Sequence, residues 1–151
     1  MLRKVAGVIV GYIVMALLVF LTFSGAYLAM GAGQAFKPGS FNVSLRWIAV
    51  SLVLGLIAAI VGGFICALIA KSTRAAQVLA GIVLLLGIIV AIPALTRVDT
   101  RPIVRPREVS NIQAMQNART PKWFAILNPI VSTIGVLVGA GLRQRTSKTS
   151  A

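Results

Sequence analysis

Apolar residues in this chain gather in four long runs that are separated by polar stretches. The runs cover residues 5–30, 47–70, 75–95 and 123–142, and none of them contains Asp, Glu, Lys or Arg. A helix of about 20 apolar residues is long enough to cross a bilayer. The pattern therefore predicts an all-α integral membrane protein, with four transmembrane helices in a compact up-down bundle. Residues 1–151 are expected to form a single membrane domain.

The second run carries a small side chain at every fourth residue, while its opposite face is bulky. Residues that recur at this spacing share one face of a helix, and small residues there let another helix approach closely. We therefore expect this run to be the central helix of the bundle. The first and fourth runs each contain a GxxxG pair of the same kind. The predicted helix-packing residues are Gly7, Gly11, Ser51, Gly55, Ala59, Gly63, Ala67, Gly135 and Gly139.

The connections between the runs contain clear turn and loop signals. Residues 37–40 read Lys-Pro-Gly-Ser, with proline and glycine at the two central positions of a turn. The loop 96–122 is the most polar part of the chain. Within it, Pro106 is expected to open a short interfacial helix through Arg119, with Val109, Ile112 and Met115 on one side. The tail from Arg143 onward is basic and is expected to end in disorder.

Two tryptophans and three polar residues stand out in or beside the second and fourth runs. Trp47 and Trp123 each open a run, where an aromatic side chain suits the boundary between head groups and hydrocarbon. The polar side chains lie around Pro129, whose ring frees one backbone carbonyl of the helix. These side chains compensate for that carbonyl or line a polar path, and both interpretations remain open. They are Asn128, Ser132 and Thr133.

The charge balance is strongly basic, with 15 Lys and Arg against 2 acidic residues and a net charge of +13. In a soluble protein this balance would suggest nucleic acid as the partner. Here the basic residues flank apolar runs, and no nucleic-acid motif accompanies them. We therefore predict contact with membrane lipids, including anionic head groups, and no binding of nucleic acid.

Four spans place both termini on the same side of the membrane. With the N-terminus inside, the inner segments are short and their basic residues adjoin the spans, as the positive-inside rule expects. The outer segments hold a similar number of basic residues, several of them in the loop 96–122. The density of charge favours the cytoplasmic membrane with both termini on the cytoplasmic side.

Groups that carry most enzyme chemistry are scarce in this sequence. There is no histidine, and the single cysteine, Cys66, lies within an apolar run, where a thiol is usually unreactive. The only acidic residues, Asp99 and Glu108, lie in a basic loop. No Asp, Glu, Lys or Arg interrupts a span, although a charged residue there usually marks a proton or ion path. The sequence thus predicts neither enzyme activity, nor a cofactor, nor a metal site.

Two main functions remain after these exclusions, beside a lipid-binding or regulatory role. The first is a non-catalytic accessory or structural subunit, which packs against other membrane-protein chains in a hetero- or homo-oligomer through its small-residue helix faces. The alternative is a channel or carrier for a small neutral or anionic solute, with Asn128, Ser132 and Thr133 along its path.

Overall fold

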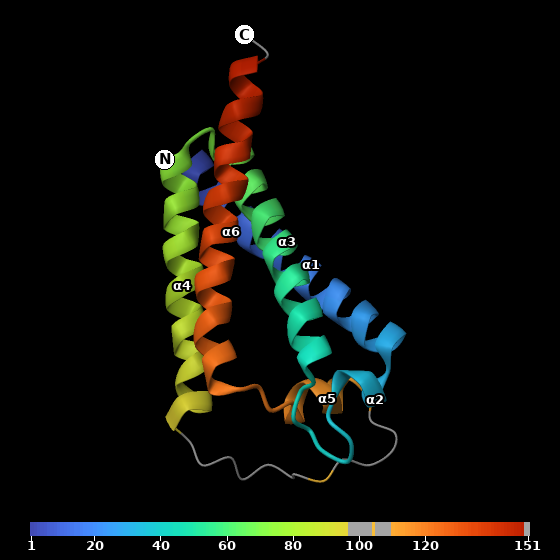
Figure 1. The fold of residues 1–151 in the computed structure, drawn as a ribbon. Helices are drawn as coiled ribbons and strands as arrows, with labels where there is room; N and C mark the ends of the chain where they lie inside the picture. The colour runs from blue at the N-terminus through green and yellow to red at the C-terminus, as the bar shows by residue number, and fades with distance from the viewer. Residues whose placement is uncertain (97–103, 105–109, 150–151) are drawn as a thin grey trace.

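The computed structural model describes residues 1–96, 104 and 110–149. Its helices are α1 (Leu2–Met30), α2 (Ala32–Ala35), α3 (Leu45–Ala70), α4 (Thr73–Thr96), α5 (Asn111–Asn117) and α6 (Lys122–Thr149). Four of them, α1, α3, α4 and α6, are long and apolar enough to cross a membrane. They run alternately up and down, so that the N-terminus and the carboxyl end of α6 lie at the same end (Figure 1). The predicted all-α bundle of four spans is confirmed.

The boundaries of the helices differ from the predicted runs in several places. The spanning helices begin one to three residues before the predicted runs, and each added stretch includes a basic residue. Helix α6 continues through Thr149, so the basic tail is helical well beyond the expected end at Leu142. The first loop contains the unpredicted helix α2. Helix α5 begins at Asn111, and the expected start at Pro106 lies outside the described residues.

Local capping explains where two of the helices begin. The Ser44 hydroxyl accepts a hydrogen bond from the Trp47 N–H at 3.1 Å, and it thereby caps α3. Ser110 caps α5 in the same way through the Gln113 N–H at 3.3 Å. Such a cap satisfies one of the backbone donors that the first turn of a helix leaves unpaired.

Helix α3 is the centre of the bundle. It packs against α1 on one flank and α6 on the other, and α4 lies mainly against α6. The first core fills the half of the bundle near the termini, and it consists mostly of alanine and other small residues. Its buried members are Ala59, Cys66, Ala67, Ala70, Ala75, Ala76, Leu79, Ala80, Val83, Val136 and Ala140.

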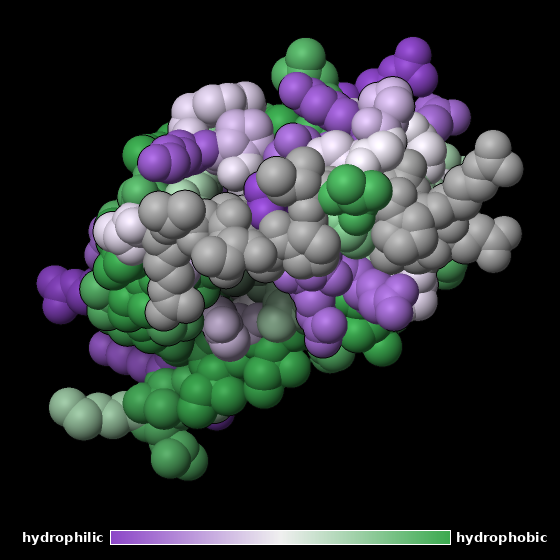
Figure 2. Space-filling view, turned by 90° about the horizontal axis from the view of Figure 1, so that it is seen from below, coloured by the Kyte–Doolittle hydropathy of each residue, from purple (hydrophilic) through white to green (hydrophobic). Residues whose placement is uncertain are grey.

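A second core lies at the other end of the bundle, where the loops on that side fold together. This core is mostly aromatic and β-branched. We call the described loop segments 31–44 and 110–121, which include α2 and α5, the cap. The buried members of its core are Tyr27, Ala35, Phe36, Phe41, Val43, Ile48, Ala114 and Phe124. Seen from this end, hydrophilic side chains gather across the described part of the cap, and apolar side chains lie along the flanks (Figure 2).

Backbone hydrogen bonds join the two loops of the cap. The Val43 N–H donates to the Arg119 carbonyl at 3.1 Å, and the Arg119 N–H donates to the Phe41 carbonyl at 3.0 Å. The predicted turn at 37–40 is present, with Gly39 at a φ of 63° and the Ser40 N–H bonded to the Lys37 carbonyl at 3.1 Å. The loop before α6 is therefore held by the loop before α3.

Candidate functional site

The two flanks of α3 meet different helices of the same chain. A Cβ atom placed on Gly62 would lie 2.9 Å from the Gly11 carbonyl oxygen of α1. A Cβ atom on the neighbouring Gly63 would lie 2.7 Å from the Val136 carbonyl carbon of α6. Separations this short leave no room for a side chain, so both helix pairs are in direct backbone contact.

The glycines of α1 and α6 complete these two contacts from the other side. A Cβ on Gly7 would lie 2.8 Å from the Ala70 side chain, and one on Gly11 would lie 2.8 Å from the Cys66 Cβ. On α6, Gly135 faces the Ala59 side chain in the same way, and Gly139 faces the Ile60 backbone. The structure thus places the glycine pairs of α1 and α6 against α3.

The remaining small residues of the α3 stripe, Ser51, Gly55, Ala59 and Ala67, are all buried. The contact with α6 is not uniform along them. A Cβ atom placed on Gly55 would have the Asn128 Oδ1 as its nearest neighbour, at 3.9 Å, which is ordinary contact. The α3–α6 contact is therefore tightest at Ala59 and Gly63, and it loosens towards the cap.

The polar residues around Pro129 have different surroundings. Thr133 donates its hydroxyl to the Pro129 carbonyl at 2.7 Å, within its own helix. That carbonyl is not the one freed by the proline ring, which belongs to Ala125, so Thr133 does not supply the expected compensation. Ser132 is half-buried. Asn128 faces Gly55, and its side chain has no hydrogen bond to another described residue.

Other hydroxyls in the spans also bond to their own helices. Thr22 donates to the Leu18 carbonyl at 2.6 Å, and Ser51 donates to the Ile48 carbonyl at 3.0 Å. A hydroxyl bonded in this way satisfies its donor without a second helix or a ligand.

The two tryptophans lie at the cap end of the bundle in different surroundings. Trp47 is half-buried, and its ring contacts the edges of Phe23 and Tyr27 at centroid distances of 6.1 and 6.2 Å. Trp123 is 52% exposed and contacts only Phe124 among the rings described, at 5.9 Å. Trp47 thus joins α1 to α3, whereas Trp123 presents half of its surface outward.

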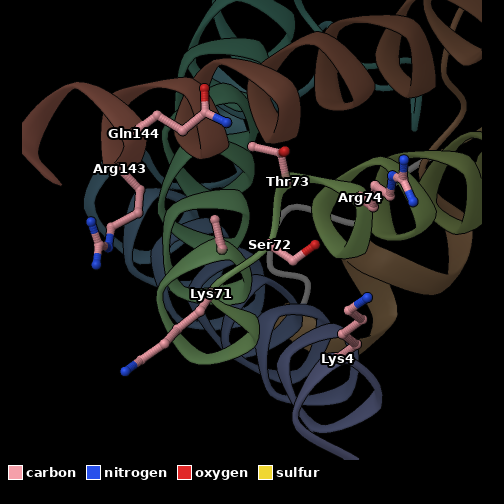
Figure 3. A pocket seen from close by; sticks show the side chains of 8 residues that line it. Lys4, Lys71, Ser72, Thr73, Arg74, Arg143 and Gln144 are labelled. Atoms are coloured by element: carbon pink, nitrogen blue, oxygen red, sulfur yellow. The ribbon is translucent and has the colours of Figure 1, made fainter. Parts of the chain in front are cut away.

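A basic hollow at the end with the termini was not anticipated from the sequence. It has a volume of about 850 Å³ and brings together Lys4 of α1, Arg143 of α6 and the turn between α3 and α4. In Figure 3, Lys4 and Arg74 lie to one side of that turn, and Lys71 and Arg143 lie to the other. The sequence shows these basic residues only as flanks of separate spans, and the bundle topology is what gathers them.

The cap is the second feature that sequence reasoning missed. Phe36, Phe41 and Val43 lie in the first connection between runs, and three large apolar residues in so short a polar stretch are the available signal. All three are buried against residues from α5 and α6. Helix α5 is also bonded to α1, because the Asn111 amide donates to the Ser24 hydroxyl at 3.0 Å.

Within the described residues, no cluster of His, Cys, Asp and Glu is suited to hold a metal ion. Cys66 is a residue of α3, and its side chain is buried in the first core, where α3 packs against the neighbouring helices. Comparisons of this chain with protein-family models, with curated proteins and with solved structures found no match.

Proposed function

We propose that this chain is a non-catalytic accessory or structural subunit that associates with another membrane chain, either a second copy or a different protein. The polar groups of its spans support this proposal. Thr22, Ser51 and Thr133 each bond to a carbonyl of their own helix. Hydroxyls engaged in this way are structural groups, and they leave little chemistry for catalysis inside the bundle.

The small-residue flanks of α3 are occupied by α1 and α6, so a partner needs another surface. The observation that carries the proposal is on α1. Gly25 is exposed, and a Cβ atom placed on it would have nothing within 4 Å. Ala29, one turn later, is exposed as well. A small residue pair at this spacing on an open helix face allows close approach of a second helix, and we assign partner contact to this face of α1.

For orientation, we propose the cytoplasmic membrane with both termini on the cytoplasmic side. The N-terminus and the carboxyl end of α6 lie at the same end of the bundle (Figure 1), and the short segments at that end are densely basic without an acidic residue. The positive-inside rule favours the cytoplasm for such segments. Single cysteines introduced at Ser72 and Ser40, in a Cys66→Ala background, test this by labelling in intact cells. A membrane-impermeant maleimide is expected to label position 40 alone. Labelling of position 72 alone would show the opposite orientation.

The association is tested by purifying the tagged protein from its native membrane in a mild detergent. Bound chains are then identified by mass spectrometry, and the particle mass is measured. Gly25→Leu is expected to reduce recovery of the complex at least fivefold. Gly81→Leu on α4 is the matched control, because Gly81 is also exposed and also has open space at its Cβ position. Equal recovery from both variants, or a monomer from the unaltered protein, would count against the proposal.

The alternative, a channel or carrier for a small neutral or anionic solute, has one observation in its favour. Asn128 presents an unbonded amide towards Gly55, at the point where α3 and α6 begin to separate. A polar group of this kind within a span is a reasonable contact for a passing solute. Proteoliposome flux of chloride, glycerol and urea tests this candidate. Asn128→Leu should abolish any flux with folding intact, and absence of flux for all three solutes rejects it.

A further inference from the structure

An apolar groove runs down the outside of the bundle between α1 and α4, next to the basic hollow. It has a volume of about 430 Å³, and apart from Lys4 and Arg74 all the side chains that line it are aliphatic. On each helix the lining residues recur at spacings of three to four and so share one face. They are Val5, Val8 and Ile9 of α1 and Ala75, Val78 and Ile82 of α4.

Lys4 and Arg74 belong to both the groove and the hollow. They form the mouth of the groove, where its aliphatic walls meet the polar turn. In Figure 3 the Ser72 hydroxyl points to the same side of the turn as these two cations. From Ala75 to Ile82 the helix rises about 10 Å, which is most of the hydrocarbon depth of one leaflet. The groove therefore begins at a polar, cationic rim and descends to the depth that an acyl chain occupies.

Lys4 and Arg74 find no acidic side chain to pair with among the residues that the structure describes. The only acidic residues of the chain, Asp99 and Glu108, belong to the loop after α4, and the first turns of α1 and α4 contain none. Both cations also lie in the first turn of a helix, where the helix dipole is positive and disfavours them. Lys71 differs, because it follows the carboxyl end of α3, where a cation is favoured. An anion bound between Lys4 and Arg74 would offset the unfavourable interaction of each cation with the positive end of its helix.

We propose that the groove and its mouth bind one anionic glycerophospholipid, with the phosphate between Lys4 and Arg74 and an acyl chain along the groove. The two parts of the site match the two parts of such a lipid. A free phosphate would use the mouth alone, and a zwitterionic lipid would bring a cation towards two cations. This inference does not depend on the proposed association through α1, whose outward Gly25 lies towards the other end of that helix.

The test is native mass spectrometry of the full chain in a neutral detergent, with phosphatidylglycerol or phosphatidylcholine added at equal concentration. One phosphatidylglycerol per chain is expected to be retained, about tenfold more than phosphatidylcholine. Lys4→Gln/Arg74→Gln should lower its retention at least fivefold. The control Lys71→Gln/Arg145→Gln removes the same charge at the same end and should change retention less than twofold. Equal retention of the two lipids, or equal loss in both double variants, overturns the proposal.

A second pair of variants tests the groove. Val78→Trp fills it, and Val90→Trp adds the same ring elsewhere on α4; these side chains are 57% and 75% exposed, so neither change disturbs a core. Only Val78→Trp should lower phosphatidylglycerol retention. Soluble glycerol phosphate in millimolar excess should compete weakly. If it displaces the lipid completely and Val78→Trp has no effect, the site recognises free phosphate and the lipid proposal is wrong.

Discussion

Gly63 of α3 and Val136 of α6 are in backbone contact: a Cβ atom on Gly63 would lie 2.7 Å from the Val136 carbonyl carbon. Val136 itself is fully buried in the first core. The contact fixes the distance between the two helices at this level. The stability of the bundle is therefore expected to depend on position 63 having no side chain.

Gly63→Ala should destabilise the protein by about 1–3 kcal/mol, because the added methyl group forces two packed backbones apart. Gly81→Ala is the control, since a Cβ atom placed on Gly81 would have nothing within 4 Å. That change should leave stability unaltered or raise it by up to about 1 kcal/mol, because alanine favours a helix over glycine. Unfolding with sodium dodecyl sulfate in mixed micelles, followed by circular dichroism, measures both. Equal midpoints for the two variants would show that α3 and α6 are not in contact at Gly63.

Lys71 lies in the short turn between α3 and α4, and its backbone is in the left-handed conformation, with a φ of 49°. Left-handed backbone costs an ordinary residue about 1–2 kcal/mol, and it disfavours β-branched residues further. Lys71→Val should therefore be less stable than Lys71→Gly by at least about 1 kcal/mol. Both variants lose the same charge, so the comparison isolates the backbone. The same unfolding measurement applies, and a more stable valine variant would exclude this conformation.

The two tryptophans should report different environments. Trp123→Phe leaves Trp47 as the only tryptophan, and Trp47→Phe leaves Trp123, whose surface is half exposed. In proteoliposomes containing lipids brominated near the head group, Trp123 should be quenched more strongly than Trp47, which packs against Phe23 and Tyr27. Stronger quenching of Trp47 would contradict the role of Trp123 as an outward interface anchor.

Most of the bundle could be predicted because a membrane constrains the sequence in simple ways. A span must be apolar and long, and a close contact between spans needs small residues, so Gly7, Gly63 and Gly139 are recognisable from their local pattern. The pattern does not say which helix fills each flank. Gly62 and Gly63 are neighbours in the sequence, yet one faces α1 and the other faces α6.

The cap and the basic hollow could not be predicted in this way, because both depend on residues far apart in the chain. Phe41 and Phe124 share one core, yet no periodicity connects them. The same limit applies to α5. Ile112, on the side of this interfacial helix that is expected to face the membrane surface, is 67% exposed, whereas Ala114 is buried in the core of the cap. The helix packs against a neighbouring loop through its small residue, and that neighbour was absent from the sequence argument.

The hydrogen bond between Asn111 of α5 and Ser24 of α1 gives a direct test of whether the cap is docked on the bundle. The Asn111 amide lies 3.0 Å from the Ser24 hydroxyl, and both residues are partly buried. A double-mutant cycle with Asn111→Ala and Ser24→Ala should give a coupling energy of about 1 kcal/mol, as expected for such a bond. A cycle of Gln113→Ala with Ser24→Ala is the control, because Gln113 is an exposed residue on the same helix. If both cycles give a coupling near zero, α5 is not held on α1, and the cap must be stabilised through the loop before α3 alone.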